Sequence, residues 1–357
     1  MQINDNGLSQ KAGDRMRILV TGCAGFIGSH LAKRLVEDGH HVVGVDNLND
    51  YYDVTLKRDR LKQIAHPQFE FIEADIADRH TMVHLFSVNQ FERVIHLAAQ
   101  AGVRYSIDFP EMYVQTNVVG FSTILECCRE FKTPHFLYAS SSSVYGGNKN
   151  YPFSTNDSVD HPVSLYAATK KSNELFAHSY SHLYELPTTG MRFFTVYGPW
   201  GRPDMALFKF TKNILNNKTI DVYNYGEMLR DFTYIDDIVE SITRLMNTIP
   251  AVNEKWHEQG APLPESFAPY QVVNIGHSEP VKLMDFIEVL EKTLGRVAEK
   301  NLMPIQPGDV PNTYADVQAL QQKIGYVPQT TIEQGIRSFV KWYESYYAVE
   351  EAVYEKL

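Results

Sequence analysis

The first half of the chain alternates short apolar runs with stretches that have helical periodicity. Residues 17–21 form the first apolar run, and Ile27, Leu31 and Leu35 then recur at the four-residue spacing of one helix face. Further apolar runs follow, at positions 41–46, 69–75, 93–99, 135–140 and 189–194. Apolar runs joined by helices are typical of a parallel sheet that is covered on both faces. The pattern therefore predicts an α/β fold with a doubly wound parallel sheet.

The pattern changes after residue 195. Turn-rich stretches appear, four prolines between 250 and 270 indicate a surface loop, and 272–276 reads as one more strand. Helices are expected over 282–294 and 331–347. We predict these units along the chain: a flexible N-terminal extension (1–15), a larger sheet domain (16–195) with a return segment near 232–249, a smaller C-terminal α/β domain (196–347) and a tail (348–357).

Composition and charge exclude some classes of protein and argue against others. Hydrophobic residues make up 44% of the 357 residues, which excludes a disordered chain, and the formal net charge of −10 argues against a nucleic-acid partner. Cys23, Cys127 and Cys128 have no metal-ligand spacing and form no even disulfide set, which indicates a reducing compartment. No run approaches the ~18 apolar residues of a membrane helix, and residues 1–15 are polar. We therefore expect a cytoplasmic protein with no membrane partner and no metal.

A glycine-rich turn joins the first strand to the first helix. Gly22, Gly25 and Gly28 follow a GxxGxxG spacing, and Asp46 comes 18 residues after Gly28, at the end of the second strand. Such glycines let a diphosphate approach a helix N-terminus, and a carboxylate at Asp46 suits an unmodified ribose, which favours NAD over NADP. Asp75 is a weaker candidate for the adenine end. A glycine-rich connection with a solvated Asp is the alternative; the strand–turn–helix context favours a Rossmann-type NAD-binding domain over 16–195.

Tyr166 and Lys170 lie one helical turn apart, so they share a helix face. An ammonium group lowers the pKa of a nearby phenol, which makes the pair a candidate general base. Serines 140–143 follow an apolar run, where hydroxyl groups at a strand's carboxyl end can contact a ligand. On spacing alone, an amphipathic pair on a surface helix is favoured over a general base, and a serine-rich turn with local hydrogen bonds is the alternative for the serines.

The glycine turn, the serines and the Tyr–Lys pair, in this order, resemble the extended branch of the short-chain dehydrogenase/reductase family. The resemblance covers 16–347, and the markers are TGCAGFIG, HLAAQ, SSSSVYG and YAATK. Within the family, AGVRYSI, RFFTVYGPWGRPDMALF, RDFTYIDDIVE and QPGDVPNTYAD are similar to the UDP-glucuronate 4-epimerases. The resemblance implies an isomerase that interconverts UDP-glucuronate and UDP-galacturonate with NAD, and a homodimer. It also implies that 196–347 mainly binds the UDP-sugar.

The resemblance also implies a role for each matching residue. Tyr166 is the expected base, Lys170 its electrostatic partner and Ser141 the proton relay. The expected cofactor contacts are Gly22, Gly25, Phe26, Ile27, Gly28, Asp46, Asn47, Asp75, Ile76, Ala98, Ala99, Asn117, Tyr166 and Lys170. The expected substrate contacts are Arg104, Ser142, Ser143, Thr195, Arg202, Arg230, Gln306 and Asp309. Gln306 stands where many epimerases of neutral sugars carry Arg, so the diphosphate contact is expected to rest more on Arg230.

The implied reaction oxidises C4 of the sugar transiently, turns the 4-keto sugar and reduces its other face. Four alternatives stay open. A 4-epimerase of UDP-glucose or a UDP-N-acetylhexosamine differs only near Arg104, Thr195 and Arg202. A decarboxylase or a dehydratase typically carries an acidic residue where Ser142 and Ser143 stand. A non-catalytic NAD-binding sensor has no need of a base.

Overall fold

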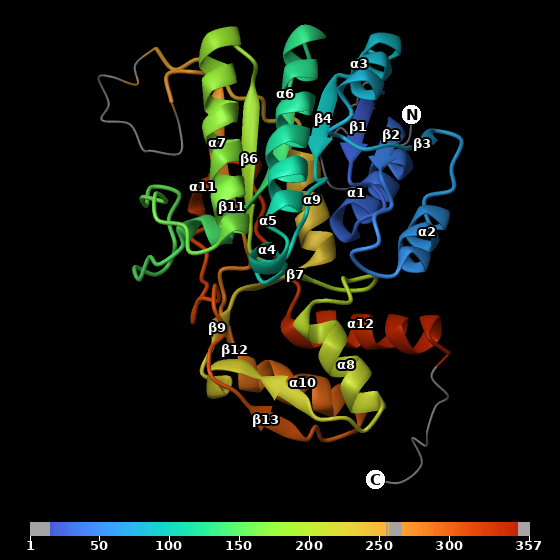
Figure 1. The fold of residues 1–357 in the computed structure, drawn as a ribbon, viewed down its shortest axis with the longest axis vertical. Coiled ribbons are helices and arrows are strands. Elements are labelled where there is room, and N and C mark those ends of the chain that lie inside the picture. Colours follow the sequence, from blue (N-terminus) through green and yellow to red (C-terminus); the bar gives the residue numbers. More distant parts are fainter. Residues whose placement is uncertain (1–14, 255, 257–265, 349–357) are drawn as a thin grey trace, which may run out of the picture.

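The computed structural model describes residues 15–254, 256 and 266–348. Residues 1–14 of the expected N-terminal extension, 349–357 of the expected tail, and 255 and 257–265 of the proline-rich loop lie outside the described residues. The described chain forms a larger upper lobe around one sheet and a smaller lower lobe (Figure 1).

The upper lobe is built on a seven-stranded sheet in which all neighbouring strands run parallel. In spatial order the strands are β11 (Tyr270–Ile275), β6 (Thr188–Phe193), β5 (Phe136–Ser141), β4 (Arg93–His96), β1 (Arg17–Thr21), β2 (His41–Asp46) and β3 (Phe69–Glu73). This confirms the predicted doubly wound α/β fold. The apolar runs at 69–75 and 93–99 extend beyond the ends of β3 and β4, because the chain leaves the sheet there.

Helices cover both faces of this sheet, which explains why its strands are apolar throughout. Along β1, Ile18 and Val20 lie in one core cluster and Leu19 lies in the other. On the first face lie α1 (Phe26–Glu37), α2 (Val54–Lys62), α9 (Ile235–Leu245) and α11 (Gln318–Ile324). On the second face lie α3 (Arg79–Val88), α6 (Phe121–Glu130) and α7 (Leu165–Tyr184). Short helical segments lead into α6: α4 (Tyr105–Asp108), α5 (Pro110–Tyr113) and the π-helical η1 (Val114–Gly120).

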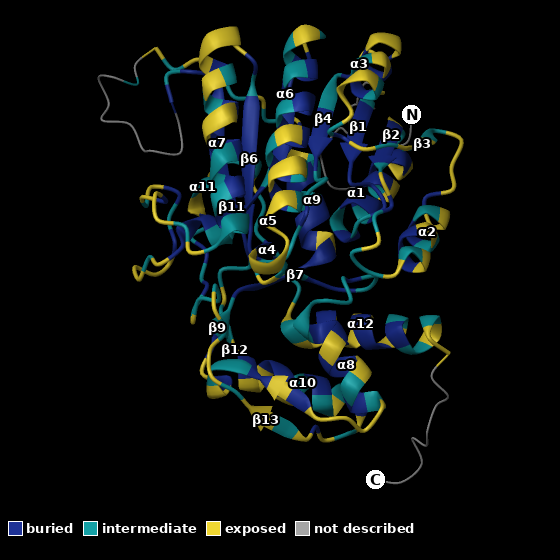
Figure 2. Cartoon of the chain, in the orientation of Figure 1, coloured by how far each residue is buried: buried dark blue, intermediate teal, exposed yellow. Residues whose placement is uncertain are grey.

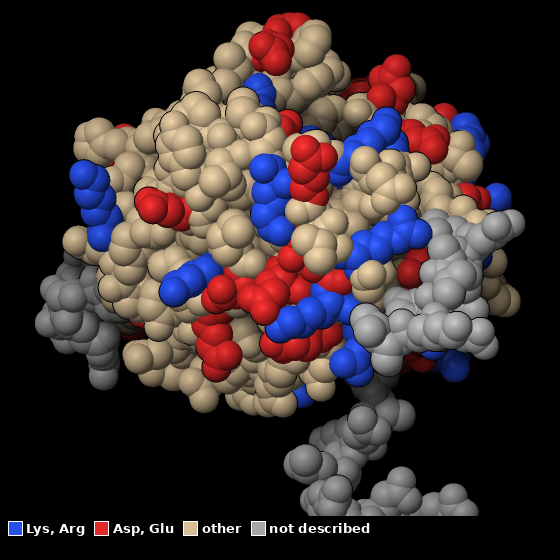
Figure 3. All heavy atoms as spheres, turned by 90° about the horizontal axis from the view of Figure 1, so that it is seen from below, with Lys and Arg blue, Asp and Glu red and all other residues tan. Residues whose placement is uncertain are grey.

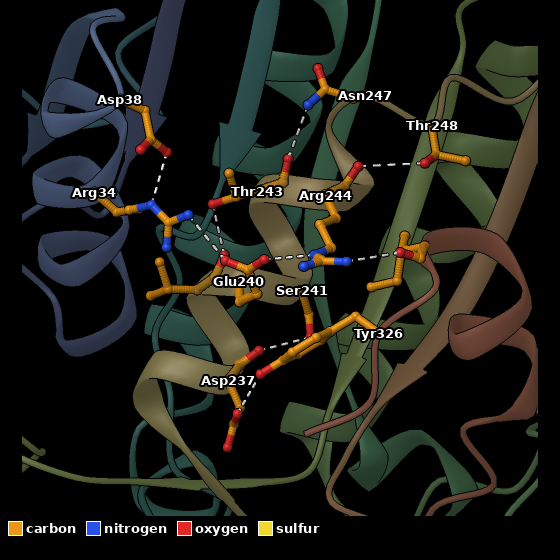
Figure 4. Close-up of polar contacts among 12 residues, drawn as sticks. Arg34, Asp38, Asp237, Glu240, Ser241, Thr243, Arg244, Asn247, Thr248 and Tyr326 are labelled. Atoms are coloured by element: carbon orange, nitrogen blue, oxygen red, sulfur yellow. Dashed lines mark hydrogen bonds and ion pairs between the residues drawn. The ribbon is translucent and has the colours of Figure 1, made fainter. Parts of the chain in front are cut away.

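Two late segments of the chain return to the upper lobe. α9 packs against α1, and Glu240 receives ion pairs from Arg34 (3.1 Å) and Arg244 (2.6 Å), while the Tyr326 hydroxyl donates to Asp237 (Figure 4). β11 pairs with β6 at the edge of the sheet, although it falls in the range expected for the smaller domain. A sequence pattern identifies a strand but not its neighbour, so the position of β11 was not predictable.

The lower lobe packs onto the upper lobe through one continuous apolar cluster. Its helices are α8 (Ala206–Leu215), α10 (Leu283–Leu294) and α12 (Ile332–Tyr346), and short helical turns occur at η2 (Ser142–Tyr145), in the upper lobe, and η3 (Tyr223–Gly226). Its strand pairs, with one pair at the junction of the lobes, are β7 (Thr195–Tyr197) with β10 (Phe232–Tyr234), β9 (Leu229–Arg230) with β12 (Val281–Lys282), and β8 (Ile220–Val222) with β13 (Lys300–Leu302). Seen from below, acidic and basic side chains lie next to one another over this lobe (Figure 3).

Candidate active site

A cavity of about 720 Å³ lies at the carboxyl ends of the sheet strands, where the two lobes meet. We call one part the glycine end, formed by Gly22, Gly25, Gly28 and Asp46. We call the other part the arginine end, formed by Arg104, Arg202 and Arg230. Tyr166, Lys170 and the serines line the wall of the same cavity. The site therefore has two chemically different ends with a titratable group between them.

At the glycine end the backbone packs too closely for any side chain. A Cβ on Gly28 would lie 2.1 Å from the carbonyl oxygen of Gly22. Gly22 has a φ of +74°, and a Cβ there would lie 2.7 Å from the backbone nitrogen of Ala98. The turn thus requires glycine at both positions, independently of any ligand.

The same turn fits a bound dinucleotide. Helix α1 begins after Gly25 without a side-chain cap, so its first backbone N–H groups remain available to an anion. The Asp46 carboxylate accepts hydrogen bonds from the backbone N–H groups of Ala24 (3.1 Å) and Leu48 (2.9 Å) and lines the cavity. Burial raises the pKa of Asp46, while the charge of Lys57 opposes this rise. A diphosphate at α1 and a ribose at Asp46 both match this chemistry.

Tyr166 and Lys170 come from the first turns of α7, and Ser141 ends β5. Burial raises the pKa of Tyr166, and the factors that oppose the rise are a hydrogen bond with Ser141 and the charge of Arg202. Lys170 is not among them: its Nζ donates to the carbonyl oxygen of Ala139 at 2.8 Å, and burial lowers its pKa to about 8. The role expected for Lys170, to lower the pKa of the phenol, stays a prediction, and the contacts with Ser141 and Arg202 act in the same direction.

A buried ion pair fixes α7 against the strands that carry the serines. Arg192 on β6 donates from Nε to Oε1 of Glu174 on α7 at 2.8 Å, and the hydroxyl of Ser140 donates to the same oxygen at 2.7 Å. The charge of Arg192 lowers the pKa of Glu174 in spite of burial. Because Ser140 precedes Ser141 and Glu174 follows Lys170 by one turn, this contact sets the distance between relay and base.

At the arginine end, two arginines contact acceptors of their own chain. Nη2 of Arg104 lies 2.7 Å from Oδ2 of Asp309, and its guanidinium lies over the Tyr223 ring, 4.7 Å from the centroid. Arg230 donates to backbone carbonyl oxygens at 2.7 Å, among them that of Val310. Burial lowers the pKa of Arg230, and the charge of Asp309 opposes that effect.

Arg202 forms a two-point contact with Asp204. Its Nε and Nη2 lie 3.0 and 2.5 Å from the two carboxylate oxygens, and the Tyr51 hydroxyl donates to Oδ2 of Asp204 at 3.2 Å. The charge of Arg202 lowers the pKa of Asp204 in spite of burial. Tyr51 lies in the loop after β2, so this contact joins the two lobes across the cavity.

Most residues expected from the sequence line this one cavity. They are Gly22, Gly25, Phe26, Ile27, Gly28, Asp46, Asn47, Ile76, Ala98, Ala99, Arg104, Ser141, Ser142, Ser143, Tyr166, Lys170, Thr195, Arg202, Arg230 and Asp309. Asp75, Asn117 and Gln306 are not among the residues that line it.

These three residues have other surroundings. Asp75 accepts a hydrogen bond from Nδ2 of Asn47 at 3.0 Å. Asn117 is buried and holds the backbone of Gln100 through both its oxygen (2.8 Å) and its nitrogen (3.0 Å). Oε1 of Gln306 is buried and has no hydrogen-bond partner among the described residues. Asn117 therefore fixes the backbone of Gln100, which lines the cavity, without lining the cavity itself.

The sequence analysis missed several polar residues of the cavity. Asp204 and Tyr51 contact Arg202 or its partner, Lys57 approaches Asp46, and Tyr223 lies beneath Arg104. Asp204 carries a local signal, since it follows Arg202 by two residues in a turn. The others come from remote segments and have no such signal.

Comparisons with known proteins agree with this geometry. A family model described as GDP-mannose 4,6 dehydratase matches residues 19–339. The chain belongs to the GDP-mannose 4,6 dehydratase family. This membership confirms the resemblance to the extended short-chain dehydrogenase/reductase family.

Relatives of this GDP-mannose 4,6 dehydratase family member match nearly its whole length. Protein CapI of Staphylococcus aureus is 58% identical, over 93% of this chain and 99% of the relative. A probable UDP-glucuronate 4-epimerase of Rhizobium meliloti is 50% identical, over 93% of this chain and 98% of the relative. The crystal structure of a UDP-glucuronic acid 4-epimerase of Bacillus cereus with UDP-glucuronic acid and NAD matches with a TM-score of 0.81 and 33% identity, over 93% of this chain and all of that chain.

In residues 15–254, 256 and 266–348 no three His, Cys, Asp or Glu side chains gather as metal ligands would. Among the described helices, none combines the length and the apolar character needed to cross a bilayer.

Proposed function

We propose that this protein is an NAD-dependent UDP-glucuronate 4-epimerase, which interconverts UDP-glucuronate and UDP-galacturonate. The observation that carries the proposal is the position of Tyr166, with Ser141 and Lys170, between a dinucleotide-shaped turn and a group of arginines. The names of the Rhizobium meliloti relative and of the Bacillus cereus structure support the same activity.

We propose that NAD lies along the glycine end, with its diphosphate at Gly22, Gly25, Phe26, Ile27 and Gly28 and its adenosine near Asp46, Asn47, Asp75 and Ile76. Ala98 and Ala99 form the wall towards Tyr166, and Asn117 supports that wall. When bound there, NAD supplies the hydride acceptor and donor for C4 of the sugar.

The chain's own residues move the proton. Tyr166 as phenolate accepts the proton of the sugar 4-hydroxyl, and Ser141 relays it through its hydrogen bond to the phenol. Lys170, with a pKa that burial lowers to about 8, supplies positive charge beside the phenol at neutral pH. An oxidised cofactor would add positive charge to the site, which favours the phenolate further.

The arginine end suits a substrate that is anionic at both ends. We propose that Arg202 with Ser142, Ser143 and Thr195 holds the sugar carboxylate, because a guanidinium matches a carboxylate. Arg230, Arg104 and Asp309, which line the cavity, then contact the diphosphate and ribose of UDP. Contacts with the carboxylate also help to protect the 4-keto uronate, which as a β-keto acid can lose CO2.

The test is turnover of UDP-glucuronate by the purified protein without added NAD, with products resolved by chromatography and NMR. We expect UDP-galacturonate, which would demonstrate both the substrate and a retained cofactor. Turnover of UDP-glucose or a UDP-N-acetylhexosamine instead would replace the substrate, and a UDP-pentose with CO2 would indicate a decarboxylase. No turnover even with NAD added would favour the non-catalytic sensor.

We also propose a homodimer that associates through α6 and α7. Large apolar side chains of α7 are exposed, including Leu175 (55% exposed) and Leu183 (64% exposed). Both α6 and α7 carry exposed residues along their length (Figure 2). A glutamate at either position should give a monomer in light scattering, and a parent protein that is already monomeric would contradict the proposal. A cytoplasmic location is consistent with Cys23, Cys127 and Cys128, which are free and buried.

A further inference from the structure

The arginine end contains carboxylates as well as arginines. Arg104 is paired with Asp309 and Arg202 with Asp204, and all four residues line the cavity. The Arg202–Asp204 pair is the more enclosed, since the two side chains are 22% and 25% exposed. A sugar carboxylate that reaches Arg202 therefore meets a guanidinium that already has a negative partner.

The contact geometry leaves one part of Arg202 available. Asp204 uses Nε and Nη2, whereas Nη1 makes no hydrogen bond to the described residues. A substrate carboxylate at Nη1 would share the guanidinium with Asp204, within a distance at which two like charges repel. The Tyr51 hydroxyl donates to Oδ2 of Asp204 and so withdraws part of that charge from Arg202.

We propose that Asp204 is a specificity-determining residue that limits how tightly Arg202 holds the sugar carboxylate. The inference rests on the proposed function and concerns the same site. A 4-epimerase must present both faces of C4 to Tyr166, so a carboxylate on C5 has to leave Arg202 and return in each turnover. The Asp204 carboxylate stabilises Arg202 when the substrate carboxylate dissociates from it. This stabilisation makes the dissociation fast.

A purely structural role for Asp204 predicts the opposite sign. If Asp204 only held Arg202 in position, its loss would weaken the binding of UDP-glucuronate and lower kcat together. If Asp204 competes with the substrate, its loss strengthens binding and slows release. The sign of the change in Kd therefore separates the two roles.

The experiment compares the parent with Asp204→Asn by calorimetric titration and steady-state kinetics. We expect the Kd of UDP-glucuronate to fall about tenfold and kcat to fall severalfold, with the Kd of UDP-glucose unchanged within twofold. The matched control is Asp221→Asn, which removes another cavity carboxylate, one bonded to Asn301 instead of an arginine. An unchanged or raised Kd in Asp204→Asn, or an equal fall in Asp221→Asn, would overturn the inference.

Tyr51→Phe gives a second test that leaves Arg202 and Asp204 in place. The ring keeps its packing against Tyr105, at 4.8 Å between centroids, while the hydrogen bond to Asp204 is lost. Asp204 then competes more strongly, so the Kd of UDP-glucuronate should rise about threefold; a fall would overturn the inference. If the parent binds UDP-glucose and not UDP-glucuronate, the proposed function fails instead, and this result is seen before any variant is compared.

Discussion

The two ends of the cavity are built in different ways. The glycine end is formed mainly by backbone from one short stretch of sequence, and its closest contacts join Gly22 to Gly28. The arginine end is formed by charged side chains from segments far apart in the chain, as the Arg104–Asp309 pair shows. The first end is shaped by sterics within its own turn, and the second by tertiary placement of charge.

This difference indicates how each end meets its ligand. The glycine end offers backbone N–H groups at α1 and has no side chain that must move aside. At the arginine end, the cations Arg104 and Arg202 are held by carboxylates of the same chain. A rigid end suits a ligand that stays bound, and an end with internal partners suits a ligand that exchanges.

The largest expected effect is on kcat and comes from a change at Tyr166. Tyr166→Phe removes the base, so kcat for UDP-glucuronate should fall about 1,000-fold, the range typical of general acid–base catalysis. The retained dinucleotide, measured by absorbance after denaturation, should be unchanged. More than a tenth of the parental kcat would show that another group takes the proton.

The next effect concerns the arginine end alone. In Arg202→Met, kcat/KM for UDP-glucuronate should fall about 100-fold, because hydrogen bonds to charged groups are worth roughly 1.5–3 kcal/mol. UDP-glucose, which has no carboxylate, should lose less, because only the effect of Arg202 on the pKa of Tyr166 remains. The control is Arg58→Met, at an exposed position on α2. Equal losses for both sugars would remove Arg202 from the carboxylate site.

A smaller effect tests the sterics of the glycine end. Gly28→Ala places a Cβ against the Gly22 carbonyl, and overpacking of this kind costs about 1–3 kcal/mol of unfolding free energy. The variant should also lose retained dinucleotide. Gly147→Ala, whose added Cβ would meet only Val163 at 4.0 Å, should leave both quantities unchanged. Full retention in Gly28→Ala would contradict the role of close backbone packing.

The smallest effect is on stability, and its sign depends on pH. Burial lowers the pKa of Lys170 from 10.5 to about 8, so below pH 8 the folded protein carries a buried charge at a cost. Above pH 8 the folded state releases this proton while the unfolded state keeps it up to about pH 10.5, and stability from this group rises. Lys170→Met should therefore stabilise the protein at pH 7, by on the order of 1 kcal/mol.

Denaturant unfolding at several pH values checks this prediction. The difference between Lys170→Met and the parent should be largest below pH 8 and should shrink as the pH rises above it. A difference that grows with pH would mean that the lysine is stabilised as a cation. It would then have a negative partner besides the Ala139 carbonyl.

The sequence predicted the glycine end and the arginine end to different extents. The glycine turn and the Tyr166–Lys170 pair are local patterns, so spacing alone was enough to place them on a turn and on one helix. The strand at Tyr270–Ile275 was recognised, but its place beside β6 depends on a contact across the chain. The effect of Arg202 on Tyr166 was not predictable for a similar reason, since Arg202 approaches it from another element.

For the arginine end, the resemblance to relatives predicted which arginines belong to the site, but not how they contact their neighbours. The two-residue separation of Arg202 and Asp204 is a local signal for their contact, but it does not show that Tyr51 reaches Asp204 from the other lobe. The Tyr51 contact depends on how the lobes meet, which no local pattern encodes.

The most direct test of the central claim is to follow hydrogen at C4 during turnover of UDP-glucuronate in D2O. If Tyr166 handles only the hydroxyl proton and the C4 hydrogen returns to the same carbon, NMR will show UDP-galacturonate with protium at C4. Deuterium at C4 or C5 of the product would mean that a carbon-bound proton exchanges with water, and would contradict the account.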